Sequence, residues 1–255
     1  RRQRQMCIRD RSMSKSFLLV GGSSDIARLL ARMLLDEGHN ITLLARDAER
    51  VEELVAHGAE LIVGDALDEA TVQAAVAHAS QQGETGLSGM AHLVGSIALR
   101  PPHATKVDDF EAVIQTNLTS AFIALKTTGK AMLKLGSGRM VFTSSVAGSY
   151  GLTNHEAIAA AKGGLEAMVR AAASTYAGRG LRVNAVAPGL TETRLGATVL
   201  RSEAIREASV GMIPLKRINE PEEIAQSIHW LLTSAPDNMT GQILHLDGGM
   251  SALRG

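Results

Sequence analysis

The sequence predicts a single α/β domain of the doubly wound type, built on a mainly parallel sheet of about seven strands. Short apolar runs alternate with longer stretches of helical period from residue 16 onward, which is the pattern of a parallel sheet covered by helices on both faces. At 255 residues and 45% hydrophobic content, the chain can bury one substantial core. Neither an internal repeat nor a composition break marks a second domain.

Each predicted strand is a short apolar run bounded by turn residues. The seven runs lie at residues 17–20, 41–44, 60–63, 91–94, 140–143, 181–186 and 242–246. After the first run, apolar residues recur at helical spacing and form one stripe that should lie on the sheet, namely Ile26, Leu29, Leu30, Met33 and Leu34. Pro221 is well placed to open another such helix. The irregular segment 190–217 is interpreted as a mobile lid over a substrate.

Composition argues against several classes of protein. The 26 basic and 26 acidic residues balance, so there is no net attraction to nucleic acid or to an anionic membrane surface. No stretch approaches the ~20 apolar residues of a membrane helix. Cys7 is the one cysteine, so we expect no intrachain disulfide and no metal centre built on cysteine. A cytoplasmic protein with a small-molecule partner is therefore expected, with no nucleic acid, membrane or metal.

Residues 1–12 differ from the rest of the chain, because they contain five Arg and one Asp and have no apolar periodicity. They lack the apolar core of a secretory signal. The stretch MCIRDR resembles the translated end of a sequencing adapter. We therefore expect the native protein to start at Met13 and to form one domain over residues 13–255, with a disordered basic arm as the alternative reading.

The first strand runs directly into a turn of small residues, Val20-Gly21-Gly22-Ser23-Ser24, and then into the amphipathic helix. Such a strand-turn-helix directs the N-terminal amides and positive dipole end of the helix at a diphosphate, as in Rossmann-type domains. Asp25 is unusual there, since its carboxylate repels a diphosphate unless it points away or caps the helix. A strand-turn-helix without a nucleotide is the alternative.

The turn resembles the T-G-x-x-x-G-x-G motif of the short-chain dehydrogenase/reductase family, with Val20, Asp25 and Ala27 as departures. Three further segments resemble that family in the right order. The resemblance extends from about Phe17 to Met250, and those segments are Pro188 to Thr193, Thr240 to Gln242 and Asp247 to Gly249. After the fourth predicted strand the family has N-N-A-G, whereas here His92-Leu93-Val94-Gly95 keeps only the glycine.

The resemblance implies a nicotinamide dinucleotide as coenzyme. Ala45 and Arg46 stand where NAD-specific relatives carry an acid for the ribose, and an Arg can pair with a 2′-phosphate, so NADP(H) is favoured over NAD(H). Arg46 as a solvated residue and Asp65 as a helix cap are the structural alternatives. The residues implied to bind the coenzyme are Gly21, Ser23, Ser24, Ile26, Arg46, Asp65, Ala66, Gly95, Lys162, Pro188, Gly189, Thr191 and Thr193.

The family uses Asn, Ser, Tyr and Lys to interconvert a carbonyl and an alcohol, and three of the four have matches here. Asn117 matches the asparagine of the proton relay, Ser145 the serine that binds the substrate oxygen, and Lys162 the lysine that binds the nicotinamide ribose. Ile158 stands at the tyrosine position and cannot donate a proton.

Two neighbours of Ile158 are candidates for the missing acid. His155 lies one helical turn earlier, and an imidazole can exchange a proton near neutral pH. Tyr150 lies in the loop five residues after Ser145. The structural alternatives are that His155 flanks its helix and that Tyr150 is only a pocket wall.

The favoured function is an NADP(H)-dependent oxidoreductase acting on a carbonyl or secondary alcohol, with an atypical active site. The first alternative is a catalytically impaired regulatory module that binds the nucleotide, and the second is a domain of this fold that binds none. The resemblance also implies a homodimer or homotetramer. The sequence does not indicate which substrate is bound.

Overall fold

The computed structural model describes residues 14–253 and places their seven strands in one parallel sheet of order β3-β2-β1-β4-β5-β6-β7. The strands are β1 (Ser16–Val20), β2 (Asn40–Ala45), β3 (Glu60–Val63), β4 (Leu87–His92), β5 (Gly138–Thr143), β6 (Leu181–Pro188) and β7 (Ile243–Leu246). The predicted fold class is thereby confirmed. The prediction for residues 1–12 lies outside the described residues.

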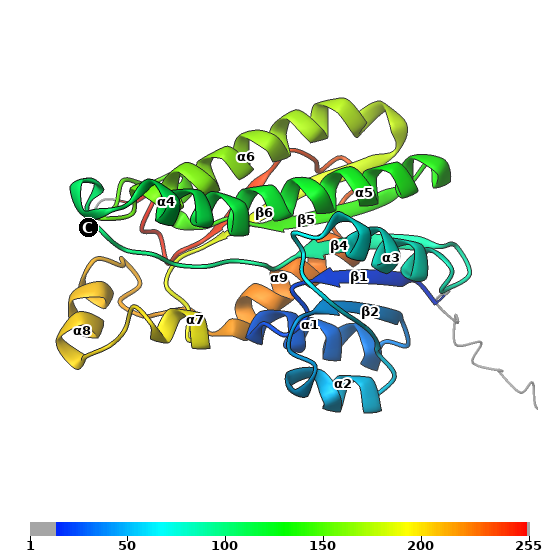
Figure 1. Ribbon diagram of the computed structural model, residues 1–255, viewed down its shortest axis with the longest axis horizontal. Helices are drawn as coiled ribbons and strands as arrows, with labels where there is room; N and C mark the ends of the chain where they lie inside the picture. Colours follow the sequence, from blue (N-terminus) through cyan, green and yellow to red (C-terminus); the bar gives the residue numbers. More distant parts are fainter. Residues whose placement is uncertain (1–13, 254–255) are drawn as a thin grey trace, which may run out of the picture.

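Helices cover both faces of the sheet (Figure 1). One layer contains α3 (Glu69–Ser80), α4 (Val107–Ile114), α5 (Ser120–Leu135) and α6 (Glu156–Tyr176), and the other contains α1 (Asp25–Asp36) and α9 (Pro221–Thr233), with α2 (Glu52–Ala56) beside α1. The predicted stripe of α1 packs as expected, with Leu30 and Leu34 fully buried against the sheet. Pro221 opens α9 as predicted.

The fourth strand was predicted at 91–94, but β4 spans Leu87–His92. The prediction was wrong because Leu93 and Val94 are apolar for another reason, since they line the crevice beyond the end of the strand. Gly89 also lies within β4, where a glycine usually weakens a strand. It is required there, because a Cβ on Gly89 would lie 2.7 Å from the buried Phe17 ring of β1.

The segment 190–217 is more regular than predicted. It contains two short helices, α7 (Arg194–Ala197) and α8 (Glu203–Gly211), whose N-caps are the hydroxyls of Thr193 and Ser202. The two ends of the segment are joined, because the Asn219 amide donates to the Leu190 carbonyl at 3.0 Å. The segment therefore begins and ends at one place, between the end of β6 and the start of α9.

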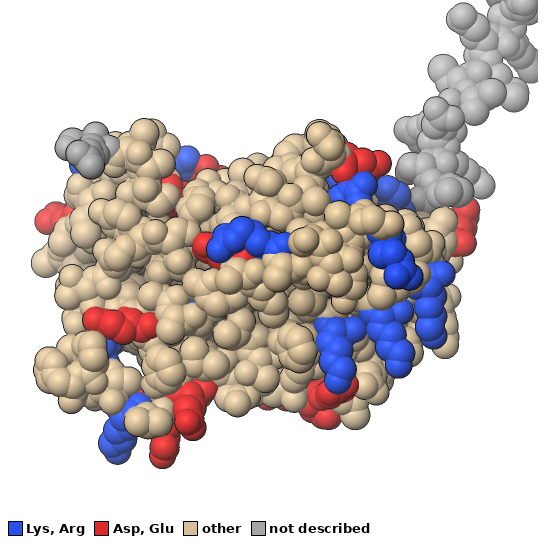
Figure 2. All heavy atoms as spheres, turned by 90° about the horizontal axis from the view of Figure 1, so that it is seen from above, with Lys and Arg blue, Asp and Glu red and all other residues tan. Residues whose placement is uncertain are grey.

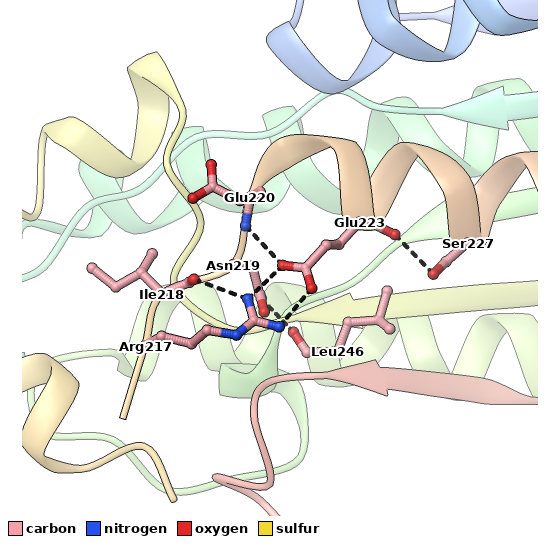
Figure 3. Close-up of polar contacts among 7 residues, drawn as sticks. All are labelled: Arg217, Ile218, Asn219, Glu220, Glu223, Ser227 and Leu246. Carbon is pink, nitrogen blue, oxygen red and sulfur yellow. Dashed lines mark hydrogen bonds and ion pairs between the residues drawn. The ribbon is translucent and has the colours of Figure 1, made fainter. Parts of the chain in front are cut away.

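A charged cluster fixes the end of this segment to α9 (Figure 3). The guanidinium of Arg217 donates to both carboxylate oxygens of Glu223, at 2.7 and 2.6 Å, and the Glu220 amide donates to the same carboxylate at 2.9 Å. These hydrogen bonds, that from Arg217 above all, lower the pKa of Glu223 to about 2. The carboxylate thus stays charged across the physiological range and holds the segment at the N-terminus of α9.

Gly89→Ala tests the close packing of β1 against β4. The added methyl group has to displace the Phe17 ring, so we expect the free energy of unfolding to fall by about 1 to 3 kcal/mol. Urea unfolding measures this change. Gly211→Ala is the control, since nothing lies within 4 Å of its new Cβ. Equal stability of the two variants would contradict the packing.

Candidate functional site

A crevice opens at the carboxyl ends of β1 and β4, where the chain crossovers leave in opposite directions. It has a volume of about 400 Å³ and is walled by the turn after β1, the ends of β4, β5 and β6, and the segment 190–217. A second hollow of about 180 Å³ adjoins it and shares the walls Ser24, Arg50, Leu93, Val94 and Gly95. Ligands of doubly wound sheets bind at such a switch point.

The glycine turn after β1 is held close to the end of β4. Gly21 has a φ of +87°, and a Cβ there would lie 2.9 Å from the Leu93 carbonyl carbon. The amides of Gly21 and Gly22 both donate to the Leu44 carbonyl at 2.9 Å, so these two amides are engaged by β2. The amides of Asp25 and Ile26 belong to the first turn of α1, which has no intrahelical acceptors for them. The donors toward the crevice are therefore in the helix rather than in the glycines.

Asp25 does not cap α1, because Ser24 does so by accepting a hydrogen bond from the Ala27 amide at 3.2 Å. The Asp25 carboxylate instead binds the Arg50 guanidinium at 2.6 Å and the Arg194 amide at 2.7 Å. It thereby joins the floor of the crevice to α7. Arg50 neutralises the charge that sequence reasoning considered an obstacle to a diphosphate.

Two arginines line the second hollow. Arg46 is largely exposed, with 78% of its side chain accessible, and lies 3.7 Å from Asp65. Arg50 is only 24% exposed and lines both the crevice and the second hollow. Sequence reasoning missed Arg50. The spacing gave no signal for it, because residues 46–48 are not helical and η1 (Glu49–Val51) begins only after them.

Asn117 is fully buried in a π-helical turn, Gln115–Thr119, between α4 and α5. Its Oδ1 accepts from the Ser96 amide at 3.1 Å, and its Nδ2 donates to the Ser96 hydroxyl and the Val113 carbonyl. Such wide turns often occur at functional sites. The π turn places this amide at the crevice wall.

Lys162 of α6 is 5% exposed, and its Nζ donates to the Thr143 carbonyl at 2.7 Å. Burial lowers the pKa of Lys162 to about 8. A Cβ on Gly95 would lie 3.9 Å from this Nζ and 3.4 Å from Asn117 Oδ1. The lack of a side chain at Gly95 thus keeps space open beside both polar groups.

Ser145 follows β5 and lines the crevice. Its Oγ accepts from the Ala147 amide at 3.2 Å, which leaves the hydroxyl proton available to a bound molecule. The loop that carries Ser145 is fixed from below, because the buried carboxylate of Glu166 accepts from the hydroxyls of Ser144 and Ser149 at 2.8 Å each.

Ile158 is buried and lies on the wall between Ser145 and the start of α6. His155 lines a smaller cavity on the same side, and its Nδ1 donates to the Thr153 carbonyl at 2.7 Å, so its Nε2 remains for a proton or a substrate. Tyr150 is 42% exposed and is absent from the walls of these cavities. Of these two candidates, His155 is the one that lines a cavity.

His92, at the end of β4, is fully buried under the crevice. The hydroxyl of Ser120 donates to the Thr116 carbonyl, so it accepts from His92 Nε2 at 2.9 Å, and the proton lies on Nε2. Burial first, and then the nearby charge of Lys162, lower the pKa of His92 to about 3. The imidazole is therefore neutral at physiological pH.

The implied coenzyme-binding residues lie together. Eight of them line the crevice, namely Ser24, Ile26, Gly95, Lys162, Pro188, Gly189, Thr191 and Thr193. The others line the second hollow, namely Gly21, Ser23, Arg46, Asp65 and Ala66. This space suits a dinucleotide for three reasons. It is open, it contains the buried cation of Lys162, and the charge of Asp25 is offset by Arg50.

Such a crevice at the switch point of a seven-stranded parallel sheet defines a protein of the dinucleotide-binding α/β class. A protein-family profile described as enoyl-(acyl carrier protein) reductase matches residues 21–251. A 2-(S)-hydroxypropyl-CoM dehydrogenase of Xanthobacter autotrophicus is 31% identical over 254 residues, which cover 96% of this chain and 99% of that protein. An inactive 2-(S)-hydroxypropyl-CoM dehydrogenase of the same organism is 32% identical over 231 residues, which cover 88% and 100%.

Among solved structures, a putative NAD(P)-dependent gluconate 5-dehydrogenase from Beutenbergia cavernae, with NADP bound at low occupancy, is similar with a TM-score of 0.86. It is 28% identical, and the match covers 95% of this chain and 99% of that one. The chain belongs to the short-chain dehydrogenase/reductase family of oxidoreductases. Within residues 14–253, no helix is long and apolar enough to cross a bilayer, and no group of His, Cys, Asp and Glu is arranged to hold a metal ion.

The neutral state of His92 predicts an acid-dependent loss of stability. The folded protein binds a proton on His92 less tightly than the unfolded chain does. The contribution of neutral His92 to the free energy of unfolding is therefore complete above pH 6.5 and is lost as the pH falls toward 3. Between pH 6.5 and 4.5 this loss of unfolding free energy amounts to about 2 kcal/mol. We expect His92→Asn to flatten the pH dependence of urea unfolding by that amount, while exposed His103→Asn leaves it unchanged. A slope that His92→Asn does not alter would show that His92 is not the titrating group.

Proposed function

We propose that this protein is an NADP(H)-dependent oxidoreductase that interconverts a carbonyl compound and a secondary alcohol at an atypical active site. The observation that carries the proposal is the buried Lys162 ammonium, which faces the same open space at Gly95 as Asn117. A cation that is buried without an ionic partner is costly, and a residue of shifted pKa in a cleft is a candidate for a functional role. Ser145 stands on the wall of the same crevice.

NADP(H) is proposed over NAD(H) because of the charge at the second hollow. Arg46 is exposed there and carries only a weak link to Asp65 at 3.7 Å, so it can turn to a 2′-phosphate. Arg50 lies nearer the crevice and suits the diphosphate, where it offsets Asp25. The similar gluconate 5-dehydrogenase, with NADP bound, supports this choice.

The side chains of the crevice divide the remaining tasks. Lys162 would hold the nicotinamide ribose, and the amides at the start of α1 would bind the diphosphate. When bound, the nicotinamide would supply or accept the hydride at the carbonyl carbon. The Ser145 hydroxyl would donate to the carbonyl oxygen and fix its position beside the coenzyme.

Proton transfer is the atypical step. We place Ile158 at the position of the family tyrosine, and an aliphatic side chain has no proton to give. His155 Nε2 would donate the proton to the carbonyl oxygen in reduction and take it back in oxidation, while Nδ1 stays bonded to the Thr153 carbonyl. Asn117 would hold a relay water, as in the family.

A catalytically impaired module that binds the nucleotide is the second candidate. It is favoured by Ile158, since the crevice then lacks a phenol, and by a similar protein of 32% identity that is named inactive. The two candidates differ in one measurement, because the module would bind NADPH without turnover of any carbonyl compound.

We further propose a cytoplasmic homodimer or homotetramer with a small-molecule substrate and no nucleic-acid or membrane partner. The face formed by α5 and α6 carries few charged side chains over its middle, while Lys and Arg gather toward one end (Figure 2). Phe122 and Leu135 of α5 are 54% and 44% exposed. Exposed apolar surface of this kind is typical of protein interfaces.

Turnover of NADPH over a panel of aldehydes and ketones tests the oxidoreductase. We expect Lys162→Met to abolish turnover and His155→Gln to lower it about 100-fold, because a general acid contributes at least that factor. Tyr150→Phe is the matched control and should retain full rate. Loss of rate in Tyr150→Phe with none in His155→Gln would reverse the assignment of the acid. Tight NADPH binding without any turnover would establish the second candidate.

Paired arginine variants test the coenzyme. We expect Arg46→Ala to raise the Kd of NADPH about tenfold and to leave that of NADH unchanged, since it removes one charge-assisted contact to the 2′-phosphate. Arg50→Ala should weaken both coenzymes equally, because the diphosphate is common to them. Coenzyme fluorescence measures each Kd. A preference of the wild type for NADH would contradict the proposal.

A further inference from the structure

A cavity of about 150 Å³ lies beside the crevice on the side of the segment 190–217. We call it the side cavity. It shares Ser145, Ile158 and Gly189 with the crevice, so a molecule bound there would reach the proposed reaction centre. Its remaining wall comes largely from apolar side chains, including Leu152, Val199, Met212, Ile213 and Met250.

Among residues 14–253, the wall of the side cavity contains no Lys, Arg, Asp or Glu. Two ion pairs of the segment 190–217 form away from the side cavity, since Arg206 pairs with Glu192 and Arg217 with Glu223. Arg201 lines a separate open hollow beyond Ile97 and Val199. The described wall of the side cavity therefore offers no Lys or Arg to pair with an anionic substrate, and an unpaired charge among its apolar side chains is unfavourable.

Two polar side chains of the side cavity, Ser145 and His155, keep an atom that can bond to a substrate. The Ser145 hydroxyl faces both spaces, and His155 keeps its Nε2 unbonded to the protein. The hydroxyl of Ser209 is used within α8, where it donates to the Ile205 carbonyl at 2.7 Å. A carbonyl oxygen held at Ser145 and His155 would therefore place its carbon skeleton among apolar walls.

We infer that the substrate is an uncharged ketone, or the corresponding alcohol, whose apolar skeleton is about the size of a six-membered ring. A volume of about 150 Å³ can hold a molecule of the size of benzene. The inference rests on the proposed function, which supplies the hydride and the proton. It adds that the side cavity selects by charge and by size.

Three ketones test this inference with the full chain and NADPH. They are 4-methylcyclohexanone, 4-oxocyclohexanecarboxylate of similar shape but with a negative charge, and the larger 2-decalone. We expect kcat/KM to be about 100-fold higher for 4-methylcyclohexanone than for the carboxylate, since the side cavity offers the charge no partner. 2-Decalone should be turned over poorly. Faster turnover of the carboxylate, lost in Arg201→Ala, would overturn the inference.

Matched variants localise the selection to the side cavity. Met212 lines it and is 58% exposed, so Met212→Lys adds a cation with little effect on folding. We expect this variant to shift the preference toward the carboxylate about fivefold, as for a solvent-screened ion pair. Leu215→Lys is the control, because Leu215 is 63% exposed and lies outside the wall. An equal shift in both variants would assign the effect to net charge and contradict the inference.

Binding measurements separate this inference from the proposed function. If NADPH binds but no ketone turns over, the oxidoreductase proposal fails. Calorimetric titration of 4-methylcyclohexanone and of the carboxylate then reports on the side cavity alone. Tighter binding of the uncharged ketone, reversed by Met212→Lys but not by Leu215→Lys, would still support the inference. Equal or tighter binding of the carboxylate to the wild type would overturn it.

Discussion

The structure depends first on the contact between the turn after β1 and the end of β4. The crossovers from these two strands leave on opposite sides. Because Gly21 has no side chain, the turn can approach the Leu93 backbone so closely that a Cβ on Gly21 would lie 2.9 Å from the Leu93 carbonyl carbon. The amides of Gly21 and Gly22 are anchored on β2 at the same time. The helix α1 is thus aimed into the crevice, and every residue of the candidate site is placed relative to this contact.

Charge inside the crevice is arranged at the expense of stability. Lys162 is buried with one carbonyl as its protein acceptor, and burial lowers its pKa to about 8. His92 beneath it stays neutral and so adds no second charge. Asp25 would oppose an anionic ligand, but Arg50 compensates it within 2.6 Å. The crevice therefore keeps a cation where the family places the ribose and reduces repulsion where it places the diphosphate.

Much of the fold could be predicted because it depends on local pattern. Alternating apolar runs indicate the strands, and the stripe from Ile26 to Leu34 indicates the face of α1 that is buried. The fourth strand was misplaced because Leu93 and Val94 are apolar as crevice walls rather than as strand residues. The bond between Asp25 and Arg50 joins residues 25 positions apart, so it depends on how η1 (Glu49–Val51) packs and could not be predicted from spacing. The side cavity likewise requires four segments that are distant in the sequence to meet, at residues 97, 145–158, 189–213 and 250.

The π turn at Gln115–Thr119 has a consequence for how this helix can change. A π turn holds one residue more than an α turn, so the faces of α4 and α5 are rotated relative to a continuous helix. Deleting one residue from the turn would restore regular i to i−4 bonding and give a better helix. The same deletion would swing Asn117 out of register with Ser96. The helix would then be more regular and more stable, but Asn117 would no longer meet Ser96. At this position the rotation of the helix about its axis matters more than its local hydrogen bonding.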